Sequence, residues 1–128
     1  MVVAAAVIER DGRLLITKRQ HGVHLEGYWE FPGGKCEPGE TLAACLSREL
    51  REELAVNVLV GGEVFTASHA YADRIVELHF LACSLLNDPQ PQLGQDMMWA
   101  RRDELQSLRF PPADAELIQQ LARGLDEW

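Results

Sequence analysis

The stretch that decides the fold runs from residue 34 to residue 56 and reads GKCEPGETLAACLSRELREELAV. Residues 41–54 are expected to form the best helix of the chain, because leucines recur every four residues along one buried stripe: Leu42, Leu46, Leu50 and Leu54. At about 100° per residue, Glu49, Glu52 and Glu53 share an arc of roughly 100° that borders this stripe. The three acids therefore lie along the edge of the core and not opposite it.

Three carboxylates this close together repel one another, and a hard divalent cation relieves that repulsion. Taken alone, three acids on a helix are more often a solvated acidic face than a metal site. Their context favours a metal site. A glycine turn at Phe31-Pro32-Gly33-Gly34 precedes the helix, Glu40 follows that turn, and Arg48 stands directly before the first acid.

The segment resembles the signature of the Nudix hydrolases, G-x5-E-x7-R-E-U-x-E-E-x-G-U, in which U is a bulky aliphatic residue. The residues that fall on this pattern are Gly34, Glu40, Arg48, Glu49, Leu50, Glu52, Glu53 and Val56. Ala55 stands where the family has a glycine in a left-handed conformation. If that geometry is kept, alanine costs on the order of 1 kcal/mol, which should affect the end of the helix more than the chemistry.

The resemblance implies a Mg²⁺ site, with Mn²⁺ as an alternative ion. Glu49 and Glu53 would be the principal ligands, and Glu52 would assist them or act as the base for the attacking water. The backbone carbonyl of Gly33 would be a further ligand. Which carboxylate is the base stays open at this point.

The remaining residues of the pattern have structural roles in this interpretation. Arg48, which belongs to the same catalytic segment, can hold an acidic side chain in a bidentate pair. Glu40 would fix the loop to the helix, and Gly34 would serve the backbone of the motif.

Beyond this segment, Thr17-Lys18-Arg19, residues 29–35 and residues 110–114 resemble the MutT branch of the family, so the likeness spans nearly the whole chain. That branch cleaves nucleoside triphosphates to a monophosphate and pyrophosphate, and a residue after Phe-Pro-Pro-Ala reads the base. Here that residue is Asp114. An ionised carboxylate only accepts hydrogen bonds, so it favours an amine such as cytosine N4 and repels guanine O6. Alternatively, Asp114 caps the last helix, and the two roles are compatible.

Other substrate contacts are implied less directly, and each of these residues has a structural or solvated role as its alternative. Arg19 would lie near the base or the phosphates, or else is a solvated charge at a strand end. Trp29 and Phe31 could offer stacking surface, or else belong to the core. His69 and His79 are the histidines best placed for a pocket role, with structural or solvated roles as the alternative. Asp96 is the only acid near Trp99 that could supply an auxiliary ligand.

Length, composition and charge limit the classes of protein. The 128 residues, 47% hydrophobic and 25% charged, predict a single domain over residues 1–128. The net charge of -8 argues against a nucleic-acid polymer or an anionic membrane as a partner. A small nucleotide remains compatible, because a metal can bridge its phosphates to carboxylates. We expect the chain to act as a monomer or a homodimer.

The cysteines and the start of the chain indicate the compartment. Cys36, Cys45 and Cys83 are odd in number and lack CxxC spacing, so neither a disulfide framework nor a zinc site is expected. The apolar residues 1–8 are too few to span a membrane and have no basic leader, so they should form a strand. A reducing cytoplasm is the expected location.

The expected fold is α/β (α+β), a Nudix-type αβα sandwich with a mixed β-sheet between helices. Strands are predicted at residues 2–9 and 13–19, joined by a hairpin turn, and at residues 56–67, 74–84 and 97–100. Residues 20–29 are expected to be loop. Besides the helix at 41–54, helices are predicted at residues 103–108 and 113–125.

The sequence thus predicts a Mg²⁺-dependent nucleoside triphosphate pyrophosphohydrolase that prefers a cytosine nucleotide, such as CTP, dCTP or a modified form, and cleans the nucleotide pool. One alternative is cleavage of 8-oxo-dGTP. Another is a non-catalytic Nudix domain that senses nucleotides, although such modules usually lose members of the acidic trio.

Overall fold

The computed structural model describes residues 1–124. Its elements are β1 (Val2–Arg10), β2 (Arg13–Lys18), β3 (Trp29–Glu30), β4 (Gly33–Lys35), α1 (Leu42–Leu54), β5 (Val58–Ala70), β6 (Ile75–Leu85), β7 (Met97–Arg101), the 3-10 turns η1 (Arg102–Ser107) and η2 (Pro112–Asp114), and α2 (Ala115–Arg123). The helix expected at 113–125 therefore begins with a 3-10 turn, and Leu125 lies outside the described residues.

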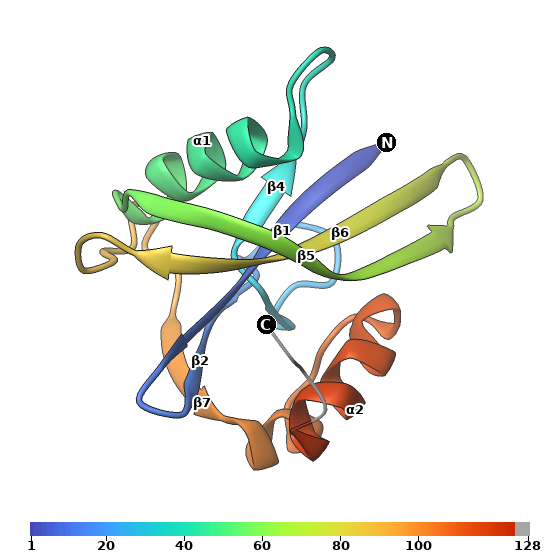
Figure 1. The fold of residues 1–128 in the computed structure, drawn as a ribbon. Helices are drawn as coiled ribbons and strands as arrows, with labels where there is room; N and C mark the ends of the chain where they lie inside the picture. The colour runs from blue at the N-terminus through green and yellow to red at the C-terminus, as the bar shows by residue number, and fades with distance from the viewer. Residues whose placement is uncertain (125–128) are drawn as a thin grey trace.

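The described strands form one mixed sheet in which β1 is central (Figure 1). The main path is β3-β2-β1-β6-β5, while β4 pairs with β1 and β7 pairs with β2. The β1–β6 pairing is parallel, and the other pairings are antiparallel. The first half of β1 lies between β4 and β6, and its end turns into β2 through the predicted hairpin. The expected mixed sheet is confirmed.

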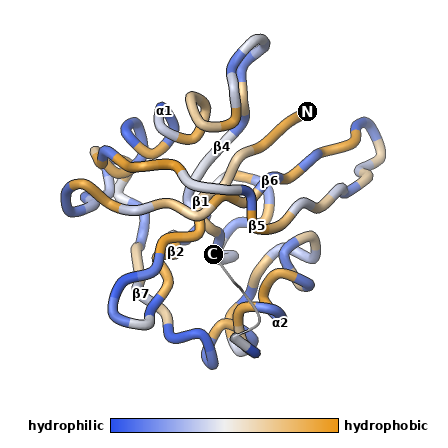
Figure 2. The backbone as a smooth tube through the Cα atoms, viewed as in Figure 1, coloured by the Kyte–Doolittle hydropathy of each residue, from blue (hydrophilic) through white to orange (hydrophobic). Residues whose placement is uncertain are grey.

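Two hydrophobic cores lie on opposite faces of this sheet, one under α1 and one under α2 (Figure 2). Alternation along β1 supplies both: Ala4, Ala6 and Ile8 belong to the α1 core, whereas Ala5 and Val7 belong to the α2 core. Leu46, Leu50 and Leu54 are fully buried in the α1 core, as their spacing predicts. The helices therefore cover both faces, which makes the αβα sandwich.

The double glycine before α1 is not the turn that the sequence suggests. Gly33 and Gly34 begin strand β4, opposite Ala5 and Ala4 of β1. A Cβ atom on Gly33 would overlap the carbonyl oxygen of Ala4, and one on Gly34 would collide with the carboxylate of Glu49. Glycine is therefore required at position 33 for close approach to the β1 backbone, whereas a side chain at position 34 would displace the Glu49 carboxylate.

Ala55 keeps the left-handed conformation that the family glycine would have, with φ 51° and ψ 36°. Its N–H donates to the carbonyl of Arg51 at 3.1 Å and closes α1. Because a side chain is strained in this region, we expect Ala55→Gly to stabilise the protein by about 0.5–1 kcal/mol. Thermal unfolding should show a melting temperature a few degrees higher. The matched control is Ala43→Gly, an exposed helical position of α1, which should melt lower; a lower value for both variants would contradict this account.

One expectation about the cysteines is wrong. Cys36 and Cys45 are joined by a disulfide, with their Cα atoms 5.2 Å apart. Counting cysteines could not reveal this, because the turn after β4 folds back onto the start of α1 and brings two distant positions together. Cys83 is free and buried. Among the helices of residues 1–124, none has the length and apolar character needed to cross a membrane.

Candidate active site

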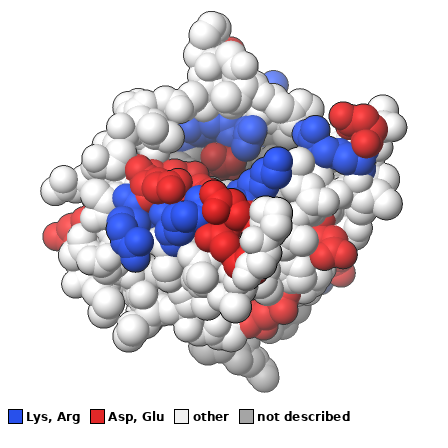
Figure 3. Space-filling view, turned by 90° about the horizontal axis from the view of Figure 1, so that it is seen from above, with Lys and Arg blue, Asp and Glu red and all other residues white. Residues whose placement is uncertain are grey.

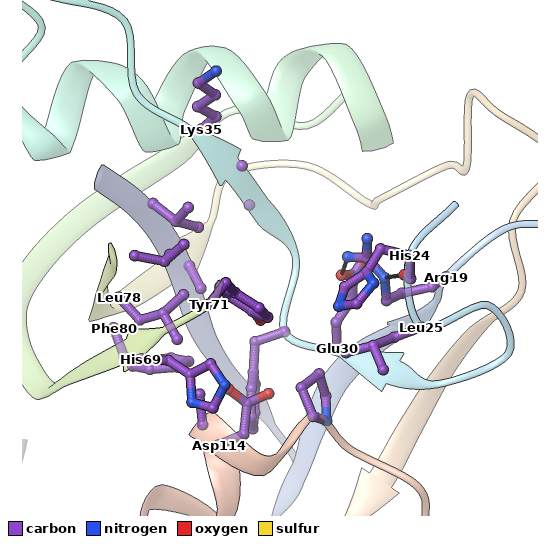
Figure 4. A pocket seen from close by; sticks show the side chains of 18 of the residues that line it. Arg19, His24, Leu25, Glu30, Lys35, His69, Tyr71, Leu78, Phe80 and Asp114 are labelled. Atoms are coloured by element: carbon purple, nitrogen blue, oxygen red, sulfur yellow. Dashed lines mark hydrogen bonds and ion pairs between the residues drawn. The ribbon is translucent and has the colours of Figure 1, made fainter. Parts of the chain in front are cut away.

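A cavity of about 390 Å³ opens between the sheet, η2, the loop that carries His24 and Leu25, and the turn that carries Tyr71 and Arg74. Its walls come from β1, β3, β4, the end of α1 and the β5–β6 hairpin. Figure 4 shows Asp114 pointing into it beside His69, with Arg19, His24 and Glu30 gathered on the opposite wall. Seen from above, acidic and basic side chains lie together around a hollow in this surface (Figure 3). The volume is in the range of small-molecule sites.

Arg48 holds the loop before α1 against the helix. Its guanidinium donates two hydrogen bonds of 2.8 Å to the two carboxylate oxygens of Glu40 and one of 3.1 Å to the carbonyl of Lys35. This pairing, with a backbone bond from Glu37, lowers the pKa of Glu40 to about 2. The same bonds raise the pKa of Arg48. Arg48 and Glu40 thus connect β4, the loop before α1 and α1 itself. These are the structural roles that the sequence predicts for the two residues.

Glu49 and Glu52 also lie around Arg48. The guanidinium is 2.9 Å from Glu49 and 3.4 Å from Glu52. Within residues 1–124, no group of three or more His, Cys, Asp or Glu side chains is already arranged to hold a metal ion. The donor set nevertheless fits a hard cation, because it consists of carboxylate oxygens on one helix end.

Glu53 is the carboxylate of this group that faces the cavity. Burial raises its pKa to about 8, and the negative charges of Glu30, Glu49 and Glu52 add to the effect. A hydrogen bond from the backbone of Gly33 acts in the opposite direction. Glu53 and Gly33 therefore meet at the wall of the cavity. The protein itself offers little positive charge to balance an ionised Glu53 there.

Glu30 and Arg19 form an ion pair on the opposite wall, with 2.7 Å between Arg19 Nη1 and Glu30 Oε2. Burial raises the pKa of Glu30 in spite of this partner, which lowers it. Arg19 is held further by the backbone carbonyl of His24. The solvated alternative for Arg19 does not apply, because the side chain lines the cavity and is only 28% exposed.

Asp114 is 6% exposed and points into the cavity. It occupies the N-cap position of α2, yet its side chain makes no capping hydrogen bond within the described part of the chain. Burial raises its pKa to about 7, the charge of Glu30 adds to this, and Arg19 opposes it. A carboxyl group that is buried without serving the helix is available to a ligand.

Phe31 lines the cavity but is mainly a core residue. It is 4% exposed, and it packs edge-on against Phe80 and with tilted rings against Phe110, with ring centroids 5.9 and 5.5 Å away. Its place in the core is observed, and its role as a stacking surface for a substrate stays a prediction.

Of the two histidines expected near a pocket, one lines the cavity and the other does not. His69 lines the cavity and makes an edge contact with Tyr71. His79 does not line it. Because β6 alternates, Leu78 and Phe80 face the cavity and His79 faces away, where it pairs with Glu63 and lies 3.5 Å from Glu77. The structure therefore places His79 outside the cavity to which the sequence interpretation had assigned it.

Several cavity residues were not assigned from the sequence. Glu30 belongs to the segment 29–35 that resembles the MutT branch, but its sequence neighbours do not indicate that its side chain is half-buried in a cavity. The β5–β6 hairpin also brings Tyr71 and Arg74 to the cavity, where the guanidinium lies 5.6 Å from the ring centroid. A hairpin tip of this composition carries no signal that it folds over a distant strand.

Asp96 lies outside this site. It is exposed, whereas its neighbour Gln95 donates a hydrogen bond of 3.2 Å to the backbone carbonyl of Glu53. Gln95 lines a smaller recess that also contains Glu30 and Glu53. The acid expected to approach the metal site is therefore replaced there by an amide.

The fold is an αβα sandwich with a cavity of the size of small-molecule sites, and the last turn of α1 brings carboxylates to that cavity. The chain matches the NUDIX domain over residues 3–120. It is 36% identical over 118 residues to the CTP pyrophosphohydrolase of Escherichia coli K12, covering 91% of this chain and 87% of that protein. It is 34% identical over 122 residues to the 8-oxo-dGTP diphosphatase of Haemophilus influenzae, covering 93% and 89%.

Solved structures agree with this likeness. The solution structure of the E. coli ORF135 protein has a TM-score of 0.83 and 36% identity, covering 92% of this chain and 85% of that one. A MutT protein from Methanosarcina mazei Go1 has a TM-score of 0.86 at 18% identity, covering 99% and 96%, which shows the shared fold. The chain belongs to the NUDIX family and is a MutT-like Nudix hydrolase.

Proposed function

We propose that this chain is a Mg²⁺-dependent pyrophosphohydrolase that cleaves a nucleoside triphosphate to the monophosphate and pyrophosphate, with a cytosine nucleotide preferred. Its relatives named CTP pyrophosphohydrolase and 8-oxo-dGTP diphosphatase support a triphosphate substrate. The protein would work as a single domain in the cytoplasm and remove unwanted nucleotides from the pool.

The observation that carries the proposal is the position of Glu53. Its carboxylate lies at the cavity wall beside the Gly33 backbone, and Glu30, Glu49 and Glu52 repel its charge. A divalent cation would relieve this repulsion and also neutralise charge on the phosphates. Glu49, Glu52, Glu53 and the Gly33 carbonyl are the proposed ligands, with Mn²⁺ as a second ion that the same oxygens could hold.

The chain's own residues would orient the substrate around this ion. Arg48 and Glu40 keep β4 at a fixed distance from α1, which sets Gly33 against the helix. Arg19, Lys35 and Arg74 line the cavity and offer positive charge to the phosphates. The metal supplies charge neutralisation and a more acidic bound water, and the carboxylate that is left free would accept the proton of the attacking water.

Asp114 supports the cytosine preference. When ionised, it can accept from the amine at cytosine N4 and cannot donate to guanine O6. The second candidate, 8-oxo-dGTP, has an observation of its own in favour: a pKa of about 7 leaves part of Asp114 protonated near neutral pH, and that form can donate. Both bases are therefore included in the test.

The test is a pyrophosphate-release screen with Mg²⁺ over CTP, dCTP, 5-methyl-dCTP, dGTP and 8-oxo-dGTP. We expect release with cytosine nucleotides foremost, complete loss after addition of EDTA, and recovery when Mg²⁺ is restored in excess. Release that persists in EDTA would contradict the metal requirement. Release of phosphate without pyrophosphate would contradict the cleavage position, and the absence of any release would contradict the proposal as a whole.

A further inference from the structure

The disulfide between Cys36 and Cys45 spans the junction between β4 and α1. Cys36 follows β4 directly, and its N–H donates to the carbonyl of Val2 at 2.9 Å. Cys45 lies in the second turn of α1, fully buried in the α1 core. The bond closes a segment with a sequence separation of 9, and the loop around Glu40 lies within it.

This junction sets the distance between the glycine backbone and the acids of the helix. The Cys45 sulfur lies 3.8 Å from the carbonyl oxygen of Gly34. Gly34 in turn lies so close to Glu49 that a Cβ atom at this position would displace the Glu49 carboxylate. One turn along the helix, Arg48 makes the second link to β4 through the carbonyl of Lys35. The disulfide and Arg48 are thus adjacent links across the same interface, one a covalent bond and the other a hydrogen bond to a backbone carbonyl.

We propose that Cys36 and Cys45 form a reversible redox modification site that holds Gly33 and Gly34 against the acids of α1, so that oxidation tightens binding of the divalent cation. The effect on turnover rests on the function proposed above, whereas formation of the bond does not. With thiols at both positions, this spacing would rest on non-covalent contacts such as the Arg48 bond to Lys35, the Gly33 hydrogen bond to Glu53 and the strand pairing. The oxidised state is then the more active one, at the low metal concentrations where binding limits the rate.

Oxidation by hydrogen peroxide balances as follows. The thiolate of Cys36, which is half-buried and reachable, attacks a peroxide oxygen and becomes a sulfenic acid while hydroxide leaves. The thiol of Cys45 then attacks that sulfur, forms the disulfide and releases water. Two thiols and one peroxide give one disulfide and two waters, and the two electrons pass from sulfur to oxygen. A dithiol reductant reverses the bond and is itself oxidised to a disulfide.

Cys83 provides the internal control. It is free and buried on strand β6, and burial raises the pKa of its thiol to about 12. Its thiolate is therefore scarce at neutral pH, and it should not react with peroxide on the same timescale.

The test compares the full-length protein after treatment with hydrogen peroxide and after treatment with dithiothreitol. Peptide mass spectrometry should show the 36–45 bridge as the loss of two hydrogens, and calorimetry should measure Mg²⁺ binding directly. We expect a melting temperature about 5–10 °C higher in the oxidised protein. We expect half-maximal Mg²⁺ concentrations for binding and hydrolysis to be roughly 3–10-fold lower.

Variants separate the pair from other effects. Cys36→Ser should respond to neither treatment, and Cys45→Ala serves as a second such variant if the first folds poorly. Cys83→Ser should respond as the wild type does. A bridge that forms without changing Mg²⁺ affinity would overturn the proposal, as would a peroxide-treated protein with no bridge. If the bridge shifts melting and Mg²⁺ binding while no triphosphate is cleaved, the proposed function fails and the redox site stands.

Discussion

Glu53→Gln should reduce kcat for triphosphate hydrolysis by roughly 10³-fold or more. Glu53 faces the cavity beside Gly33, and three neighbouring carboxylates destabilise its charge in the absence of a cation. Glutamine keeps the shape of the side chain but supplies neither the charge that attracts the ion nor a basic oxygen. Steady-state pyrophosphate release with saturating Mg²⁺ measures the loss, and calorimetry should show weaker Mg²⁺ binding in parallel.

Unfolding experiments distinguish this result from a damaged fold. Burial, with the charges of Glu30 and Glu49, raises the pKa of Glu53 from 4.5 to about 8. The folded state therefore holds this proton more strongly than the unfolded chain, and the ionised group costs stability as pH rises through that interval. Without divalent cations, Glu53→Gln should melt at the same temperature as wild type or higher at pH 8.5. Wild type alone should gain markedly in melting temperature when Mg²⁺ is added.

Glu116→Gln is the control for this series, since it removes one exposed carboxylate from α2 without touching the cavity. It should retain full activity and metal binding. Normal turnover by Glu53→Gln would remove Glu53 from the proposed site and leave Glu49 and Glu52 as the acids to be tested next.

The parts of the site that the sequence predicted are those encoded within one element. The leucine spacing placed α1, and helical periodicity placed Glu49 and Glu53 at the edge of the core without knowledge of any neighbour. The strain expected at Ala55 also depended only on how a helix ends, and its left-handed conformation is observed.

The parts that the sequence did not predict depend on how elements meet. Alternation along β6 was visible, but which of its faces met the cavity was not, so His79 was assigned to the wrong face. Likewise, the disulfide partner of Cys36 became apparent only once the turn had been folded onto α1. Glu30 pairs with Arg19, which follows β2, and its charge raises the pKa of Glu53 in α1. Such contacts arise from packing and leave no periodic signal.

Selection of the base depends on both kinds of information. The sequence motif identifies Asp114, and the fold determines the buried environment around it. Asp114→Asn should shift the ratio of kcat/KM for CTP over 8-oxo-dGTP towards 8-oxo-dGTP by roughly 10–100-fold. The amide of asparagine can donate to guanine O6, which an ionised carboxylate cannot do. Competition assays with both triphosphates measure the ratio. Asp103→Asn, whose side chain is 77% exposed and outside the cavity, is the matched control and should leave it unchanged.

The pH dependence of this ratio tests the same assignment independently. Burial, aided by the charge of Glu30, raises the pKa of Asp114 from 3.8 to about 7. Below that pH the protonated carboxyl can donate to O6, and above it the carboxylate only accepts. The cytosine preference of the wild type should therefore increase as pH rises through about 7, whereas that of Asp114→Asn should stay flat, since its amide does not titrate. A wild-type ratio independent of pH, together with an unchanged ratio in the variant, would mean that Asp114 does not read the base.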